Sequence, residues 1–369
     1  MFYLSIDQHR NQITISLGDE SGNELLHRQV STRFSELEKF LTQVVERSGE
    51  EGFVVILEVC GFNDYLIKLL RGYGCRQVVL VQPERRDKRK TDRRDARKLR
   101  EALWANRDRL LSGQRIHGLR RVRIASAEEA ADRQITGLRQ KLTRLRTRIT
   151  NRVHGILMKH NLQHDCPTKT IRSIKARHWL SELDFPEVDR LEIDLLLKQW
   201  QLLDTQISHV ELQIKSRSQQ RPAAVTIASI PGISHYGSLA ISSRISRIED
   251  FPRGESLANF LGLTPSCRNS GKKQHNPGSI TKEGSPMVRH LLGQALTHTL
   301  RKDAWLRHWY QRIKRRRGTK IARVAVMRHL ATVIWSMLRY QVPYVTGGPD
   351  AYREVRQRVE TLQPATSNP

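Results

Sequence analysis

The chain has 369 residues, of which 38% are hydrophobic, and this is enough for two or three domains with cores of their own. Its 64 Lys and Arg exceed its 37 Asp and Glu by 27 charges. Solubility alone needs a net charge of only about 2–8 in a small domain, so the excess indicates a polyanionic partner, whose phosphates neutralise basic side chains and release counterions. The four cysteines form no C-x-x-C pair, which argues against a zinc site and a disulfide framework.

Residues 1–83 show the pattern of a mixed α/β domain. Residues 2–6, 13–17 and 25–30 are predicted strands, followed by a helix at 34–47 with apolar residues at helical spacing. A buried strand is predicted at 52–58, a helix at 62–73, and a further strand at 77–81 before Pro83. This order is that of a ribonuclease-H-like sheet, a fold that by itself is compatible with many functions.

The middle of the chain is basic and helical. Residues 84–123 hold 16 Lys and Arg against six Asp and Glu, and we expect them to be helical. Two heptad seams follow within residues 126–217. The first consists of Ile135, Leu138, Leu142, Leu145 and Ile149, and the second of Leu196, Trp200, Leu203, Ile207, Val210 and Ile214. An antiparallel helical hairpin, a dimerising coiled coil and an ordinary helical-bundle core all fit these seams.

The last part is predicted to be mainly helical. Ile230-Pro231-Gly232-Ile233 fits either the turn of a helix-hairpin-helix, which presents backbone N–H groups to phosphate, or a plain Pro-Gly turn. Helices are predicted near 255–261, 286–301 and 322–341, with a polar, frayed tail after Pro343. We therefore expect four segments: a catalytic domain at 1–125, a helical linker at 126–220, a second domain at 221–345 and a polar tail at 346–369. We find no apolar run of roughly 20 residues and expect no membrane partner.

Four carboxylates stand in positions from which they can converge. Asp7 and Glu58 lie at the ends of predicted strands, and Asp92 and Asp95 are three residues apart at a helix start, which puts them on one helix face. Such oxygen ligands suit Mg²⁺ or Mn²⁺, and two such ions can clamp the attacking and leaving oxygens of a phosphodiester. The alternative is that Asp7 is an exposed turn residue and that the helix pair only forms salt bridges with neighbouring cations.

A second group of residues surrounds Ser270-Gly271 in a polar loop at 265–284. Cations near this serine could favour its alkoxide and stabilise charge on a pentavalent phosphate. The alternative is a phosphate-binding loop with a spectator serine, in which case Ser266, Ser279 and Ser285 are equal candidates for a nucleophile. The cations in question are Lys272, Lys273, Lys282 and Arg289.

Together the two groups resemble the insertion-sequence-110 family of bacterial transposases, also called DEDD transposases. The resemblance covers residues 3–340 and rests on two groups of motifs. In the first domain they are Ser5-Ile6-Asp7, Glu58 with Gly61, Gln82-Pro83 and Lys90-Thr91-Asp92-Arg93-Arg94-Asp95-Ala96. In the second they are Ile230-Pro231-Gly232-Ile233, Phe260-Leu261-Gly262-Leu263-Thr264-Pro265, Ser270-Gly271, Ile280-Thr281-Lys282-Glu283-Gly284 and Arg289-His290-Leu291-Leu292.

The resemblance implies a specific enzyme. The N-terminal domain would be RuvC-like, with Mg²⁺ or Mn²⁺ held by Asp7, Glu58, Asp92 and Asp95, and Ser270 would be the nucleophile of the C-terminal transposase domain. A coiled-coil segment would join them. The resemblance also implies a homo-oligomer (dimer or tetramer), binding to the DNA of the element ends and target, a structured guide RNA encoded by the element, and a cytoplasmic, nucleoid-associated location. The basic helices at 84–123 and 301–323 are the regions that we assign to nucleic acid. The predicted contacts are Arg93, Arg94, Arg97, Lys272, Lys273, Lys282 and Arg289.

Some residues depart from the family pattern. Gln8-His9-Arg10 replaces the common Val-Ser-Lys after Asp7, Gln82 replaces the frequent Asn before Pro83, and the segment between Pro83 and Lys90 is short. Two other functions remain open. A metal-dependent nuclease or junction resolvase would use water in place of a serine nucleophile. A non-enzymatic nucleic-acid-binding protein would explain the charge but not the four ordered carboxylates.

Overall fold

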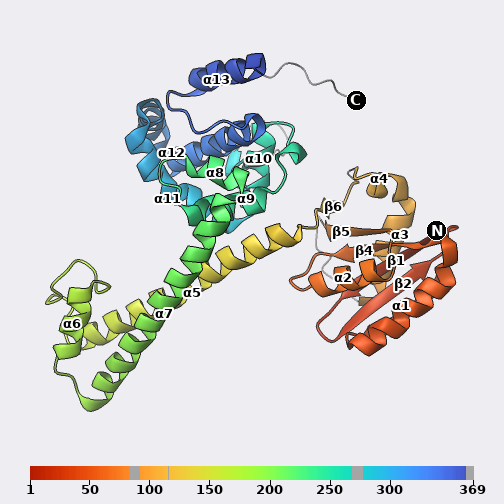
Figure 1. Cartoon of the computed structure of the whole chain (residues 1–369), viewed down its shortest axis with the longest axis horizontal. Coiled ribbons are helices and arrows are strands. Elements are labelled where there is room, and N and C mark those ends of the chain that lie inside the picture. Colours follow the sequence, from red (N-terminus) through yellow and green to blue (C-terminus); the bar gives the residue numbers. More distant parts are fainter. Residues whose placement is uncertain (84–91, 115, 268–276, 363–369) are drawn as a thin grey trace. The chain divides into compact units, whose positions relative to one another are not determined.

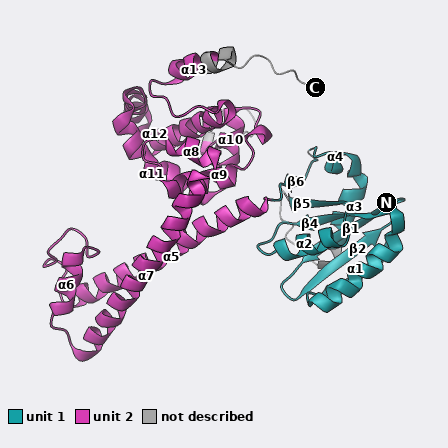
Figure 2. Cartoon of the chain, viewed as in Figure 1, with its two compact units in different colours: residues 1–124 teal, residues 125–369 magenta. Residues whose placement is uncertain are grey.

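The computed structural model describes residues 1–83, 92–114, 116–267 and 277–362 (Figure 1). The chain forms two compact units, Met1–Ile124 and Ala125–Pro369, which are coloured separately in Figure 2. The first is a mixed α/β sheet domain and the second is mostly helical, as the sequence pattern predicts.

A six-stranded sheet forms the centre of the first unit. Its order is β3-β2-β1-β4-β5-β6, with β1, β4 and β5 parallel to one another and the other neighbours antiparallel. The strands are β1 (Phe2–Gln8), β2 (Gln12–Gly18), β3 (Glu24–Ser31), β4 (Phe53–Glu58), β5 (Gln77–Pro83) and β6 (Leu119–Val122). The first five strands confirm the predictions. The prediction that residues 84–123 are helical throughout is wrong at β6, because the edge of β5 offers hydrogen bonds to a segment too polar for the core.

Helices cover both faces of this sheet. On one face Leu37 and Phe40 of α1 (Phe34–Ser48) and Leu66 of α2 (Asp64–Gly72) pack on β1 residues such as Leu4. A short 3₁₀ turn, η1 (Gly49–Glu51), follows α1. On the other face α3 (Asp92–Ala105) and α4 (Arg107–Leu111) pack on alternate residues of the same strands. Two apolar layers therefore enclose the sheet.

A long helical hairpin begins the second unit. It consists of α5 (Ala127–Lys159), α6 (Ile174–Glu182) and α7 (Glu187–Gln219). Arg139 pairs with Glu211 and Lys159 pairs with Asp189, so α5 and α7 run antiparallel. Of the three interpretations of the heptad seams, the structure shows the antiparallel hairpin.

The predicted seam is correct on α7 and partly wrong on α5. Trp200, Leu203 and Ile207 of α7 are buried against α5, whereas Leu138 and Leu145 of α5 are exposed. The buried positions of α5 include Thr136, whose hydroxyl is satisfied by the Asp132 carbonyl oxygen at 2.7 Å. A pattern of apolar residues alone could not identify a buried threonine as part of that face.

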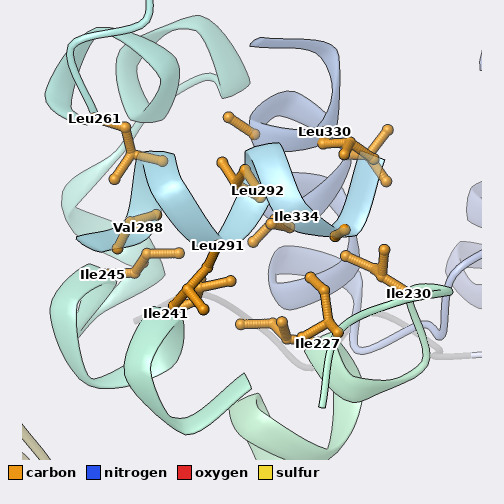
Figure 3. Packing of buried hydrophobic residues seen from close by; sticks show 14 of the residues in the cluster. Ile227, Ile230, Ile241, Ile245, Leu261, Val288, Leu291, Leu292, Leu330 and Ile334 are labelled. Atoms are coloured by element: carbon orange, nitrogen blue, oxygen red, sulfur yellow. The ribbon is translucent and has the colours of Figure 1, made fainter. Parts of the chain in front are cut away.

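The rest of the second unit packs around one core. Figure 3 shows Ile241, Leu292 and Ile334, from three different helices, meeting in it. The elements are α8 (Pro222–Ala228), α9 (His235–Ile245), η2 (Ile248–Asp250), α10 (Gly254–Phe260), β7 (Pro265–Cys267), β8 (Pro277–Ile280), α11 (Pro286–Lys302), α12 (Ala304–Tyr340) and α13 (Pro349–Leu362). Among the described helices, α12 alone is long and apolar enough to cross a membrane, and half of its apolar window is buried inside the fold. This window fits a core helix as well as a membrane span.

An ionic joint ties the hairpin to these helices. The Asp132 carboxylate of α5 is 4% exposed and accepts hydrogen bonds from Arg217 at 3.0 Å and from Arg221 at 3.1 Å. Next to it, Arg133 donates to the Ser243 carbonyl oxygen at 2.7 Å. The base of the hairpin is therefore fixed to α9.

The C-terminal part differs from the prediction at one point, and two expected helices are one element. The tail after Pro343 is not wholly frayed, because Pro349–Leu362 forms α13. Tyr352 of this helix packs on Tyr344, and its hydroxyl oxygen accepts a hydrogen bond from Val345 N at 2.9 Å. The basic helix expected at 301–323 and the helix predicted at 322–341 form one element, α12, which begins at Ala304 and contains a kink at Gly318, whose φ is +81°.

Candidate active site

The two strand-end carboxylates lie side by side. In the parallel β1–β4 pair, Ile6 is opposite Leu57, so Asp7 and Glu58 are the next residue on each strand. Residues 3 and 5 of β1 and residues 54 and 56 of β4 face α3, and side chains alternate along a strand. Asp7 and Glu58 therefore project on the face of the sheet that α3 covers. Asp7 is 13% exposed, and its Oδ2 is 3.2 Å from His9 Nε2.

The beginning of α3 lies at the same end of β1. Ser5 Oγ donates to the Ala96 carbonyl oxygen at 2.6 Å, which fixes the first turns of the helix to the strand two residues before Asp7. Further along, Trp104 Nε1 donates to the Glu20 carbonyl oxygen at 2.9 Å, near the opposite end of β1. The helix thus runs from the Asp7 end of the sheet to the other end. Asp95, half-buried, is adjacent to Ala96.

Asp92 is the first residue of α3, and its side chain lies outside the described part of the structure. The same holds for Arg93 and Arg94. The structure therefore brings Asp7 and Glu58 together, places Asp95 in the helix that covers them, and leaves the side chain of the fourth predicted ligand undescribed.

The loop after Glu58 is held by buried polar side chains. Asn63 Oδ1 accepts from Cys60 N at 2.6 Å, and Asn63 Nδ2 donates to Gln8 Oε1 at 2.9 Å. Burial, together with the negative charges of Asp7 and Glu58, raises the pKa of the Cys60 thiol above its usual value. The thiol therefore lies within electrostatic reach of both carboxylates. Gln8 and Asn63 were not among the predicted site residues, and the departure from the family pattern at Gln8 was the available signal.

The donor set suits a hard divalent cation, because its described members are carboxylate oxygens at one strand edge. Within the described part of the chain, no group of three His, Cys, Asp or Glu residues is close enough to hold a metal ion. A complete site would need the side chain of Asp92, which lies outside that part.

Arg97, one of the predicted nucleic-acid contacts, has an ionic partner within the domain. Its guanidinium makes a bidentate pair with Glu24, with the shorter contact at 2.6 Å. Although burial opposes the shift, hydrogen bonds from Arg97 and Ser16 hold the pKa of Glu24 below its usual range. Arg97 thus links α3 to β3.

The predicted nucleophile lies between two short strands. β7 and β8 pair antiparallel, with Pro265 opposite Ile280, and frame residues 268–276. Ser270, Lys272 and Lys273 fall within that segment and lie outside the described residues. Of the other serines considered, Ser266 donates to the Ser279 carbonyl oxygen at 3.1 Å, and Ser285 caps α11 by accepting from Val288 N.

The motif residues on either side of this hairpin contact each other. A Cβ at Gly284, whose φ is +77°, would lie 2.0 Å from the Phe260 carbonyl oxygen, so only glycine fits this approach. Arg289 donates to the Leu261 carbonyl oxygen at 3.0 Å and to that of Gly284 at 3.2 Å. Arg289 therefore holds the two motif segments together, while Lys282 is exposed.

The turn at Pro231-Gly232 joins two helices, α8 and α9, and packs against α11. Thr299 Oγ1 donates to the Pro231 carbonyl oxygen at 2.8 Å, and a Cβ at Gly232 would meet His298 and the backbone of Ala295. The contacts that the structure shows for this turn are therefore internal ones.

A strongly basic surface lies on α12. This helix contains ten Lys and Arg and no Asp or Glu. Six of the cations fall within nine residues around the Gly318 kink and are exposed: Arg312, Lys314, Arg315, Arg316, Arg317 and Lys320. We call these six the α12 basic surface. Its concentrated charge is of the kind that binds a phosphate backbone.

Comparison with known proteins assigns this arrangement to the DNA transposases. Residues 4–161 match a transposase family model named for DEDD transposases of IS110, and residues 224–311 match the model described as "Transposase IS116/IS110/IS902 family". The chain belongs to the IS110 family of insertion-sequence transposases.

Curated relatives agree with this assignment over most of their length. The chain is 25% identical over 311 residues to the "Transposase for insertion sequence element IS1111A" of Coxiella burnetii, which covers 79% of each chain. It is 26% identical over 304 residues to the "Probable family 20 transposase" of Pseudomonas aeruginosa, covering 80% of this chain and 86% of that one. It is 22% identical to an IS110 protein of Streptomyces coelicolor, covering 74% of this chain and 76% of that one.

Proposed function

We propose that this transposase cuts and rejoins DNA strands with a divalent-metal site formed by Asp7, Glu58, Asp92 and Asp95 and with Ser270 as nucleophile. The observation that carries the proposal is the placement of Asp7 and Glu58 on adjacent strands, on the face that the beginning of α3 covers. The sheet order β3-β2-β1-β4-β5 supports a RuvC-like fold for this domain. The coarser assignment, a DNA transposase, rests on the family.

The chemistry needs two transesterifications. Ser270 Oγ attacks the scissile phosphorus, loses its proton and forms a phosphoserine ester, while the leaving strand departs with a free hydroxyl group. A strand hydroxyl then attacks the same phosphorus and releases the serine. The bond count is unchanged, so no ATP is needed. Mg²⁺ or Mn²⁺, when bound, would polarise the phosphate and stabilise developing charge.

A serine adduct distinguishes this mechanism from a metal-dependent nuclease that uses water. We would incubate supercoiled plasmid carrying the element ends and target with the protein, Mg²⁺ and the flanking RNA of the element. We expect a covalent protein–DNA adduct on a denaturing gel with wild type, and none with Ser270→Ala. Ser266→Ala is the matched control, because its hydroxyl bonds within the β7–β8 hairpin. Adduct-free cleavage by Ser270→Ala that is lost in Asp7→Asn would support the nuclease instead.

The α12 basic surface is proposed to bind the phosphates of element DNA or of a structured guide RNA. Its six cations have no acidic neighbour on their own helix, so phosphate would be their strongest partner. Each phosphate contact that is lost lowers the slope of log affinity against log salt by about 0.9 for duplex DNA. We therefore expect Arg315→Ala with Arg316→Ala to lower that slope by roughly 2. Lys39→Ala, on the other unit and paired with Glu36, should leave the slope unchanged.

Duplex element ends, random duplex and the flanking RNA, tested separately with this double variant, identify the nucleic acid. An effect on the RNA alone would assign the surface to the guide. Equal affinity of wild type and variant for all three would remove the surface from the proposal.

We also propose that the chain works in the cytoplasm, associated with the nucleoid, and that it forms a homo-oligomer. A second apolar stripe on α7 supports the homo-oligomer, because its members follow heptad spacing but face away from α5. The members are Val188, Leu191, Leu195, Leu202 and Leu212, which are 49% to 75% exposed. We expect Leu195→Asp with Leu202→Asp to reduce the sedimentation coefficient to that of the monomer. Thr147→Asp, exposed on α5 and outside this stripe, is the control. An unchanged oligomer in the double variant would exclude this stripe as the interface.

A further inference from the structure

A pair of buried amide side chains crosses the end of the β1–β4 ladder. Gln8, the residue after Asp7, is 7% exposed, and Asn63, the residue before α2, is 5% exposed. Asn63 Nδ2 donates to Gln8 Oε1 at 2.9 Å. The parallel ladder between the two strands ends at Ile6 and Leu57, so this side-chain bridge continues the connection beyond the last backbone pair.

The Asn63 side chain holds the turn after Glu58 at two points. Its Oδ1 accepts from Cys60 N at 2.6 Å, and its Nδ2 also donates to the Glu58 carbonyl oxygen at 3.2 Å. In return, Gln8 Nε2 donates to the Phe62 carbonyl oxygen at 3.0 Å. The two amides thus join the backbone of Glu58 and of the turn that follows it to the residue that follows Asp7.

Deep burial makes this bridge costly to leave incomplete. An amide group without a partner in such a place would lose its hydration without compensation, and here both amides have their partners in each other and in one turn. The bonds are short-range and directional, so they fix the backbone of Glu58 relative to that of Asp7 more tightly than apolar packing would. No bond of the bridge reaches the apolar core of the domain.

We propose that Gln8 and Asn63 are positioning residues that hold Asp7 and Glu58 at the separation at which both bind one divalent cation. The inference rests on the proposed function, since it takes these two carboxylates as metal ligands. Groups that orient ligands in this way change metal affinity by about 10- to 100-fold when they are removed.

The test measures Mn²⁺ binding to the full chain directly, by the loss of the free-ion signal in electron paramagnetic resonance, together with thermal unfolding. We expect Asn63→Ala to weaken Mn²⁺ binding by about 10-fold. We also expect high Mn²⁺ to restore its strand-transfer activity. Gln8→Met, which keeps the volume of the side chain and removes its hydrogen bonds, should weaken binding similarly and serves if Asn63→Ala does not fold. The double variant should be little weaker than either one, because the two amides act as a unit.

Asn106→Ala is the matched control. This asparagine donates to the Ala102 carbonyl oxygen at 3.0 Å, after the far end of α3, so its loss should lower stability without changing Mn²⁺ affinity. Wild-type affinity in folded Asn63→Ala and Gln8→Met would overturn the positioning role while leaving the metal site intact. If the metal site itself does not exist, wild type will bind Mn²⁺ no better than Asp7→Asn does. The positioning role would then fail together with the metal site.

Discussion

Replacement of Asp132 by alanine tests whether the ionic joint at the base of the hairpin stabilises the second unit. The Asp132 carboxylate is 4% exposed and pairs with Arg217 and Arg221. Removal of one partner from a buried ion pair costs about 3–5 kcal/mol. The two arginines are 37% and 28% exposed, so water can solvate them again. We therefore expect the smaller loss of about 2 kcal/mol in the free energy of unfolding.

Tryptophan fluorescence in a urea titration can measure this loss in the full chain. Five of the six tryptophans follow residue 125, so the signal reports mainly on the second unit. For a unit of this size, about 2 kcal/mol corresponds to a melting temperature lower by roughly 4–8 °C. Glu211→Gln, which breaks the exposed pair with Arg139, is the control and should cost at most about 1 kcal/mol. A loss below about 0.5 kcal/mol for Asp132→Ala would refute the reasoning, because it would mean that the joint contributes no more than an exposed pair.

Three further predictions concern the second unit. Trp200 is the largest fully buried side chain, and Trp200→Ala should lower the free energy of unfolding by about 3–5 kcal/mol in the same urea titration. Gly284→Ala should reduce the yield of soluble protein and the melting temperature, because its Cβ would overlap the Phe260 carbonyl oxygen; a melting temperature equal to wild type would contradict this close approach. Burial beside the Trp305 and Trp309 rings lowers the pKa of His329 from 6.5, so the unfolded state binds its proton first as the pH falls. The free energy of unfolding should therefore decline below pH 6.5, and it should decline less steeply in His329→Gln. His308→Gln, at an exposed histidine, is the control. Equal pH profiles in wild type and His329→Gln would exclude His329 as a cause of the decline.

Much of the candidate site was predictable from the sequence, because strand ends and helix starts have local signals. The run Val54 to Leu57 closed by Glu58 predicts a buried strand with a carboxylate at its edge, and β4 confirms the strand. The spacing of Asp92 and Asp95 predicts a helix start, and α3 begins at Asp92. Their roles as metal ligands, and that of Ser270 as nucleophile, stay predictions.

The tertiary structure decided which side chains share a partner. No local pattern relates Gln8 to Asn63 or Asp132 to Arg221, because hydrogen bonds between residues far apart in the chain depend on how the elements pack. The same holds for the α5 face, where a buried threonine replaced the expected leucines.

Composition and periodicity by themselves determined the basic character of the chain, the order of its first five strands and the family motifs, since each of these is a property of neighbouring residues. Only packing decided that Arg97 forms a pair with Glu24, that Arg289 joins two motif segments, and that α7 leaves a second apolar stripe exposed. The physical reason is that a side chain's partner is set by which surfaces meet after folding, and a one-dimensional pattern does not contain that information.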